Sequence, residues 1–120
     1  MEEQNITIEK GTHGFLTLAG SDLFKGNVVL KIDGKETSLR DKYTIQVSPN
    51  LHIIPNDDSG KYINHSCFPN LMVNERRQFV ALMDIKKGEE ITFDYNSTED
   101  ELAEQFYCNC GHENCRGKIQ

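Results

Sequence analysis

The sequence predicts a mostly β domain with one short helix near its C-terminus. Short stretches rich in β-branched and apolar residues recur through most of the chain, and clusters of glycine, proline, asparagine and aspartate separate them. The chain has 120 residues, which suits one domain with a modest hydrophobic core. No internal repeat, low-complexity tract or linker interrupts the pattern, so many short strands joined by turns are expected.

Three strands alternate with turns in the first part of the chain. They are expected at residues 6–9, 15–19 and 28–32, where β-branched and other apolar residues dominate. Glycines at both ends of residues 11–14 predict a tight turn, and Lys25-Gly26-Asn27 predicts a second one. Asp33-Gly34 predicts a hairpin turn after the third strand.

Two strand pairs, a final strand and a helix are expected to follow. Residues 43–47 pair with 51–54, residues 71–74 pair with 79–85, and the last strand covers 90–95. The helix is expected over residues 99–106. Ser97 or Thr98 can cap its N-terminus, and Asp100 or Glu101 stands three residues further on, as in a capping box.

The composition excludes several classes of protein. The net charge of -6 argues against a general nucleic-acid binder, which needs a basic surface, and suits a basic protein or peptide partner. The alternative is that the acidic excess only keeps the domain in solution. No apolar run is long enough for a membrane span, and residues 1–4 lack a signal-peptide core. We therefore expect an intracellular protein, cytoplasmic or nuclear, with no membrane contact.

Three of the four cysteines lie close together in a C-x-C-x4-C pattern. Cys108, Cys110 and Cys115 can supply three thiolates to one tetrahedral zinc ion. The fourth ligand must come from elsewhere, and Cys67 is the preferred choice over His112. A disulfide framework is disfavoured because the chain shows no signal peptide and two of the cysteines are only two positions apart. Four reduced structural thiols are the alternative, which leaves the clustering unexplained.

Four motifs, in order along the chain, resemble those of SET-domain methyltransferases. The central one is N-H-S-C-x-P-N at residues 64–70, and a second, G-E-E-I-T-F-D-Y, occupies residues 88–95. The C-x-C-x4-C cluster at 108–115 resembles the post-SET zinc motif of that family. Residues 11–15 and 22–26 resemble its N-terminal segment, which carries glycines.

The resemblance implies a fold, a division of the chain and a reaction. The fold has several small β-sheets, and the segment Asn64-His65 threads beneath the final strand in a knot-like arrangement, a rare exception to un-knotted topology. The SET domain would cover residues 1–106, and the post-SET segment residues 107–120. The family uses S-adenosylmethionine as methyl donor and a protein lysine as acceptor, and the two meet in a narrow channel from opposite faces.

The resemblance also assigns site residues. Tyr95 is the catalytic tyrosine that orients the amine, and Phe93, which shares its strand face, leaves room for di- or trimethylation. The residues expected to bind the donor are His13, Gly14, Phe15, Tyr62, Asn64, His65 and Phe106. Core packing is the alternative role for the aromatic residues among these, and a structural hydrogen bond is the alternative for His65.

The chain departs from the family pattern at three places. Lys61 stands where arginine is common, Tyr62 replaces a common phenylalanine, and Thr12-His13 separates the N-terminal glycines. The segment between Tyr43 and Tyr62 is short, which predicts a substrate groove that is open or is completed by a partner, including a second copy in a homodimer. Two other functions are considered, namely a catalytically weak SET-like zinc-binding interaction module and a zinc-stabilised structural protein.

Overall fold

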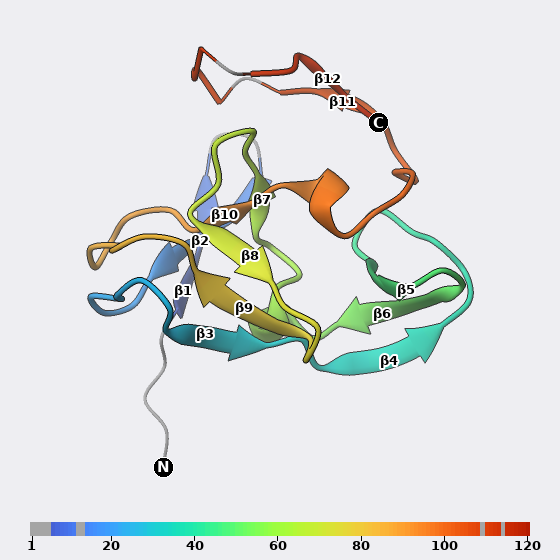
Figure 1. The fold of residues 1–120 in the computed structure, drawn as a ribbon, viewed down its shortest axis with the longest axis horizontal. Helices are drawn as coiled ribbons and strands as arrows, with labels where there is room; N and C mark the ends of the chain where they lie inside the picture. Colours follow the sequence, from blue (N-terminus) through green and yellow to red (C-terminus); the bar gives the residue numbers. More distant parts are fainter. Residues whose placement is uncertain (1–5, 12–13, 109, 114) are drawn as a thin grey trace.

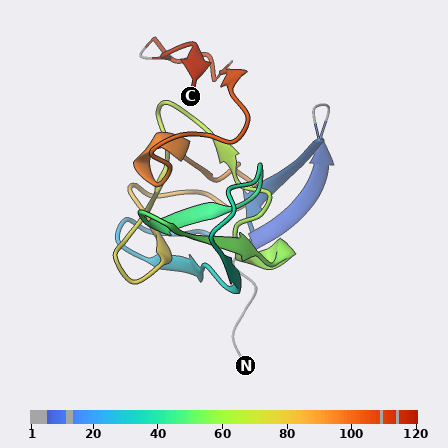
Figure 2. The same cartoon turned by 90° about the vertical axis from the view of Figure 1, so that its right-hand side faces the viewer.

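The chain folds into small sheets rather than one continuous layer (Figure 1). The computed structural model describes residues 6–11, 14–108, 110–113 and 115–120. Within these, β1 (Ile6–Gly11) pairs antiparallel with β2 (Gly14–Ala19) in the register Gly11 to Gly14. This hairpin confirms the first two expected strands and projects to one side of the molecule in the view of Figure 2.

A second sheet has the order β3-β9-β8 and carries much of the core. Its strands are β3 (Val28–Lys31), β8 (Leu71–Val73) and β9 (Gln78–Ala81). The predicted pairing of 71–74 with 79–85 is confirmed, although β9 ends at Ala81. From there the chain continues through an isolated bridge between Leu23 and Ile85.

A third sheet has the order β4-β6-β5. Its strands are β4 (Gly34–Thr37), β5 (Ile45–Ser48) and β6 (Leu51–Pro55). The predicted pairing of 43–47 with 51–54 is confirmed. The predicted hairpin at Asp33-Gly34 is wrong, because the chain passes there from one sheet to another. Gly34 instead allows close backbone contact, since a Cβ at this position would lie 1.9 Å from the Ile54 carbonyl oxygen.

Two pairs of two-residue strands complete the fold. β7 (Asn64–His65) pairs parallel with β10 (Thr92–Phe93), so the central motif lies beside the strand expected at 90–95, which is shorter than predicted because a 3₁₀ turn begins at Tyr95. β11 (Phe106–Tyr107) pairs antiparallel with β12 (Lys118–Ile119), and both views place this C-terminal hairpin at one end of the molecule. Two 3₁₀ turns, η1 (Asp57–Ser59) and η2 (Tyr95–Ser97), are the helical elements of the described residues.

The predicted helix over residues 99–106 is wrong. The chain makes a single turn after Tyr95, and Phe106 then enters β11. A segment of eight residues is too short to be a stable helix by itself. Here the side chains of Glu99 and Asp100 bind Gln46, and Leu102 N donates to the carbonyl of Gln120, so contacts with distant segments replace those of a helix.

The core extends to the strand that carries the second motif. Phe79 and Ile91 are fully buried, and the rings of Phe79 and Phe93 lie 5.1 Å apart. Phe93 in turn lies 5.0 Å from the ring of Tyr95. The residue predicted to be catalytic therefore stands directly on the hydrophobic core. In the described part of the chain, no helix has the length and apolar character needed to cross a membrane.

Candidate active site and metal centre

One large cavity brings together most of the residues predicted for the site. Its volume is about 1120 Å³, which is ample for a cofactor-sized ligand. Segments from β2, β7, β10 and the chain before β11 form its walls. The predicted site residues that line it are Gly14, Phe15, Tyr62, Asn64, His65, Phe93, Tyr95 and Phe106. His13, also predicted for the donor, lies outside the described residues.

Tyr95 lies at the centre of this arrangement. Its hydroxyl donates a hydrogen bond to the Ile63 carbonyl at 2.8 Å. The rings of Phe93, His65 and Phe106 surround it at 5.0, 5.3 and 5.9 Å. Burial raises the pKa of Tyr95, so the phenol keeps its proton at neutral pH. The site therefore presents a neutral hydroxyl with a fixed direction.

The imidazole of His65 is part of the scaffold around Tyr95. Its Nδ1 accepts the backbone N–H of Tyr95 at 3.1 Å, and its Nε2 lies 3.3 Å from the Sγ of Cys67. Burial lowers the pKa of His65, and the nearby Asp94 carboxylate opposes that shift only in part. With Nδ1 as acceptor, the neutral ring carries its proton on Nε2 and donates toward sulfur. His65 thus connects the tyrosine to the cysteine cluster.

Two further polar residues hold the motifs together. Asn64 Nδ2 donates to the Glu90 carboxylate at 2.9 Å and lies 3.4 Å from the Phe15 carbonyl oxygen. Asn70 accepts the backbone N–H of Thr92 at 2.8 Å and donates to the Glu90 carbonyl at 2.9 Å. Glu90 and Asn70 were not predicted as site residues. Asn70 ends the motif at 64–70 and Glu90 lies within the motif at 88–95, so the two motifs could have identified both residues.

Aromatic rings and a lysine form another part of the cavity wall. The ring of Tyr62 lies 4.9 Å from that of Phe15 and 6.1 Å from that of Tyr43. Lys61 Nζ lies 5.4 Å from the centre of the Tyr62 ring and 5.3 Å from that of Tyr43, within the range of cation–π attraction. Tyr43 was expected only as a strand residue, and its position in this cavity is new.

The four cysteines meet at one point. The Sγ atoms of Cys67, Cys108, Cys110 and Cys115 all lie within 4.8 Å of one another, and no disulfide joins them. A zinc ion with Zn–S bonds of about 2.3 Å would set its sulfurs roughly 3.8 Å apart, so the cluster is compatible with zinc. His112 packs its ring on Phe68 at 4.9 Å instead.

The surroundings shift two thiols of this cluster in opposite directions, and burial raises the pKa of Cys108 to about 12. Hydrogen bonding from the backbone of His112, and then of Cys67, lowers the pKa of Cys110 to about 6. Arg116 N donates to Cys67 Sγ, and the Arg116 guanidinium pairs with the Asp94 carboxylate at 2.7 Å. Arg116, which follows Cys115, thus contacts the neighbour of Tyr95 and links the cysteine cluster to the cavity.

Comparison with known proteins agrees with this architecture. A family model described as SET domain matches residues 5–96. The methyltransferase flvH of Aspergillus flavus is 35% identical over 122 residues, a match that covers 97% of this chain and 68% of flvH. The histone-lysine N-methyltransferase met-2 of Caenorhabditis elegans is 39% identical over 72 residues, which make up 50% of this chain and 6% of met-2.

Solved structures show the same fold. A crystal structure of KRYPTONITE in complex with mCHG DNA and SAH superposes with a TM-score of 0.74 at 23% identity, covering 98% of this chain and 30% of that one. The chain thus spans a small part of met-2 and of KRYPTONITE and most of flvH. The match to the family model, the relatives and the shared fold establish that this chain belongs to the SET-domain family.

Proposed function

We propose that this domain is a protein-lysine N-methyltransferase that uses S-adenosylmethionine. The observation that carries the proposal is the single cavity in which the Tyr95 hydroxyl, the Asn64 amide and the rings of Phe15 and Phe106 meet. Relatives named as histone-lysine methyltransferases, among them one described as H3 lysine-36 specific from Mycosarcoma maydis, support it. KRYPTONITE was crystallised with SAH, the demethylated form of this donor.

The cavity suits such a donor in size and chemistry. When bound, S-adenosylmethionine supplies a methyl group on a positively charged sulfur. Phe15, Tyr62 and Phe106 offer flat apolar faces for the adenine, and the amide of Asn64 with the carboxylate of Glu90 offers polar contacts for the amino-acid end. Gly14 lets the backbone of β2 approach the ligand without a side chain in the way.

The acceptor lysine would be oriented by Tyr95. Methyl transfer needs a neutral amine in line with the sulfur–methyl bond, and correct alignment supplies a large part of the rate. The Tyr95 hydroxyl directs its proton to the Ile63 carbonyl, so its oxygen can accept a hydrogen bond from the amine. The apolar channel and the positive sulfur favour the neutral amine. Nitrogen then bonds the methyl carbon, the carbon–sulfur bond breaks, and the surplus proton leaves to water.

The charge of the cavity favours a basic substrate segment. The acidic residues Asp41, Glu89, Glu90 and Glu104 contribute to its lining, whereas the lysines that do so are Lys42 and Lys61, so negative charge is in excess. Such a surplus attracts a lysine flanked by other basic residues. A KRYPTONITE structure contains an H3(1-15) peptide, so a histone tail is the first substrate to test.

The decisive experiment measures methyl transfer from isotope-labelled donor to core histones, an H3 tail peptide and a total protein extract. Label on lysine is the expected result. The second candidate function, a SET-like zinc-binding interaction module with little turnover, is favoured by Lys61 in place of the family's common arginine. Absence of donor binding by calorimetry, or donor binding without transfer to any acceptor, would contradict the methyltransferase and support that candidate.

The Phe93 side chain is expected to permit more than one methylation. It is 4% exposed, lines the cavity and packs on Tyr95. A tyrosine hydroxyl at this position would hold a water that restrains the methylated amine, whereas phenylalanine leaves space for the amine to rotate. We expect di- or trimethyl-lysine from the wild type and mainly monomethyl-lysine from Phe93→Tyr, by mass spectrometry of a substrate peptide.

The matched control for this change is Phe24→Tyr, which adds the same hydroxyl to a residue that is 59% exposed. Its products should equal those of the wild type. A wild type that stops at monomethyl-lysine with excess donor and long incubation would show that Phe93 does not have this role.

A further inference from the structure

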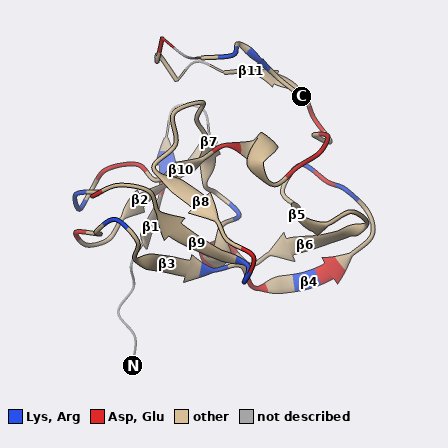
Figure 3. Ribbon diagram, viewed as in Figure 1, with Lys and Arg blue, Asp and Glu red and all other residues tan. Residues whose placement is uncertain are grey.

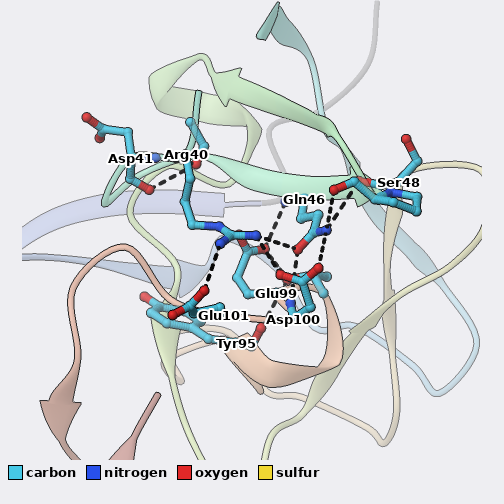
Figure 4. A network of polar contacts seen from close by, with 11 residues as sticks. Arg40, Asp41, Gln46, Ser48, Tyr95, Glu99, Asp100 and Glu101 are labelled. Atoms are coloured by element: carbon cyan, nitrogen blue, oxygen red, sulfur yellow. Dashed lines mark hydrogen bonds and ion pairs between the residues drawn. The ribbon is translucent and has the colours of Figure 1, made fainter. Parts of the chain in front are cut away.

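The chain that follows Tyr95 is fixed to a distant strand by several hydrogen bonds (Figure 4). The Glu99 carboxylate accepts the backbone N–H of Gln46, in β5, at 2.8 Å. The side chain of Gln46 completes the contact, since its Oε1 accepts Asp100 N at 2.9 Å and its Nε2 donates to the Asp100 carboxylate at 3.0 Å. Segments more than 50 positions apart in the sequence are joined here.

Glu99 is an unusual residue for such a position. It is 8% exposed, and burial raises the pKa of its carboxyl group. Removing a carboxylate from water is unfavourable unless a partner compensates. Among the described residues, Arg40 makes its ion pairs with Asp100 and Glu101 and favours the ionised Glu99 only as a more distant charge. The direct hydrogen bonds to the Glu99 carboxylate come from the Gln46 N–H and the Thr98 hydroxyl, both at 2.8 Å. A buried carboxylate held by neutral donors in a cavity wall points to a functional role.

The same residues hold the backbone of Tyr95. The Tyr95 carbonyl accepts Glu99 N at 2.8 Å and Thr98 N at 3.2 Å, and the Thr98 hydroxyl lies 3.2 Å from the same oxygen. On the other side, Tyr95 N donates to His65. Both peptide groups of Tyr95 are therefore fixed, one by β7 and the other by the turn that is attached to β5.

We propose that Glu99 is a positioning residue for Tyr95. Its carboxylate anchors the turn of residues 95–99 to the Gln46 backbone, and this anchor keeps the Tyr95 hydroxyl against the Ile63 carbonyl. The proposal rests on the proposed function, because it assigns Glu99 a share in orienting the lysine amine. The contact between Glu99 and Gln46 also explains why the chain turns after Tyr95 and does not form the expected helix.

The first test compares three variants in single-turnover methyl transfer. Glu99→Ala should lower the rate about 10- to 100-fold, the factor expected when a hydrogen bond to a charged group is lost. Donor affinity should stay within about twofold of the wild type, because positioning acts on the transition state. Glu99→Gln keeps an acceptor for Gln46 N and should recover most of the rate. Glu101→Ala, the control, removes a neighbouring exposed carboxylate of the same Arg40 cluster and should leave the rate unchanged.

The second test separates positioning from general stability. If Glu99 acts through the Tyr95 hydroxyl, Glu99→Ala should cause almost no further loss in a Tyr95→Phe background. A purely structural role would multiply the two losses. Thr98→Val, which removes only the hydroxyl that bridges Glu99 and Tyr95, should show the same dependence and serves if Glu99→Ala does not fold. Hydrogen exchange of the Thr98 and Glu99 amides should accelerate in Glu99→Ala and not in Glu101→Ala.

The outcomes distinguish this inference from the proposed function. A wild type without methyl transfer to any protein acceptor would overturn the proposed function whatever Glu99 does. An active wild type in which Glu99→Ala and Glu101→Ala have equal rates, or in which the losses of Glu99→Ala and Tyr95→Phe multiply, would overturn the inference alone.

Discussion

Replacing Tyr95 with phenylalanine is expected to lower turnover about 100-fold, the scale of loss that accompanies misalignment of a reacting group. The ring contacts with Phe93, His65 and Phe106 survive this change, and only the hydroxyl that donates to the Ile63 carbonyl is lost. Steady-state kinetics with labelled donor and a lysine peptide would measure the change. Donor affinity should remain near the wild-type value, because the hydroxyl acts on the amine in the transition state.

The stability of the Tyr95→Phe variant is the control for this prediction. Loss of one hydrogen bond should lower the free energy of unfolding by only about 1 kcal/mol. Thermal unfolding and calorimetric donor binding on the same preparation would establish that the variant is folded. A folded Tyr95→Phe variant with unchanged turnover would remove Tyr95 from the mechanism.

Removal of the metal is expected to have the second large effect. Metal analysis should find about one zinc per chain, as in closed sites with four protein ligands. Cys115→Ser, or treatment with a strong chelator, should release the ion and loosen the chain from β11 to β12. Since structural zinc contributes about 10 to 16 kcal/mol in small zinc-finger peptides, this loss should unfold the segment. Donor binding should then weaken strongly, because residues 102–108 line the cavity.

His112→Ala is the matched control for the metal prediction. This residue lies within the C-x-C-x4-C segment but packs on Phe68, and among the described residues the cluster consists of the four cysteines. Its zinc content should equal that of the wild type, whereas His112 as the fourth ligand would require a loss of metal. Full activity of a metal-free protein would contradict a role for zinc in completing the cavity.

The sequence predicted those parts of the fold that local patterns encode. The apolar and β-branched residues of β5, β6, β8 and β9 are enough to indicate strands, and the pairing of these strands follows from the short turns between them. The two-residue strands β7, β10, β11 and β12 are too short for any periodicity, so only the resemblance could predict that β7 lies beside β10. The helix failed because the capping signal at Ser97–Glu101 serves contacts with Gln46 instead.

The site, too, contains residues that the sequence predicted and residues that it did not. Residues within the motifs, such as Asn64 and Tyr95, were predicted and do line one cavity with the aromatic residues assigned to the donor. Tyr43 and Glu99 were not predicted for the site. Their positions depend on pairings across more than 15 and 50 positions of sequence, respectively, which no local pattern records. A lone carboxylate or tyrosine outside a recognisable motif carries no signal until the fold brings it to the site.

The parallel pairing of β7 with β10 has a consequence for how the protein folds. The chain between Asn64 and Thr92, which pair in this sheet, contains the β8–β9 hairpin and the loop beyond it. Contacts that close long loops form slowly, because chain entropy is lost before the contact stabilises the structure. β10 and the turn that carries Tyr95 directly after it should therefore be assembled after the hairpins on the pathway. Substitutions around Tyr95 are then expected to accelerate unfolding while leaving the refolding rate nearly unchanged, so that the catalytic end of the molecule limits its kinetic lifetime.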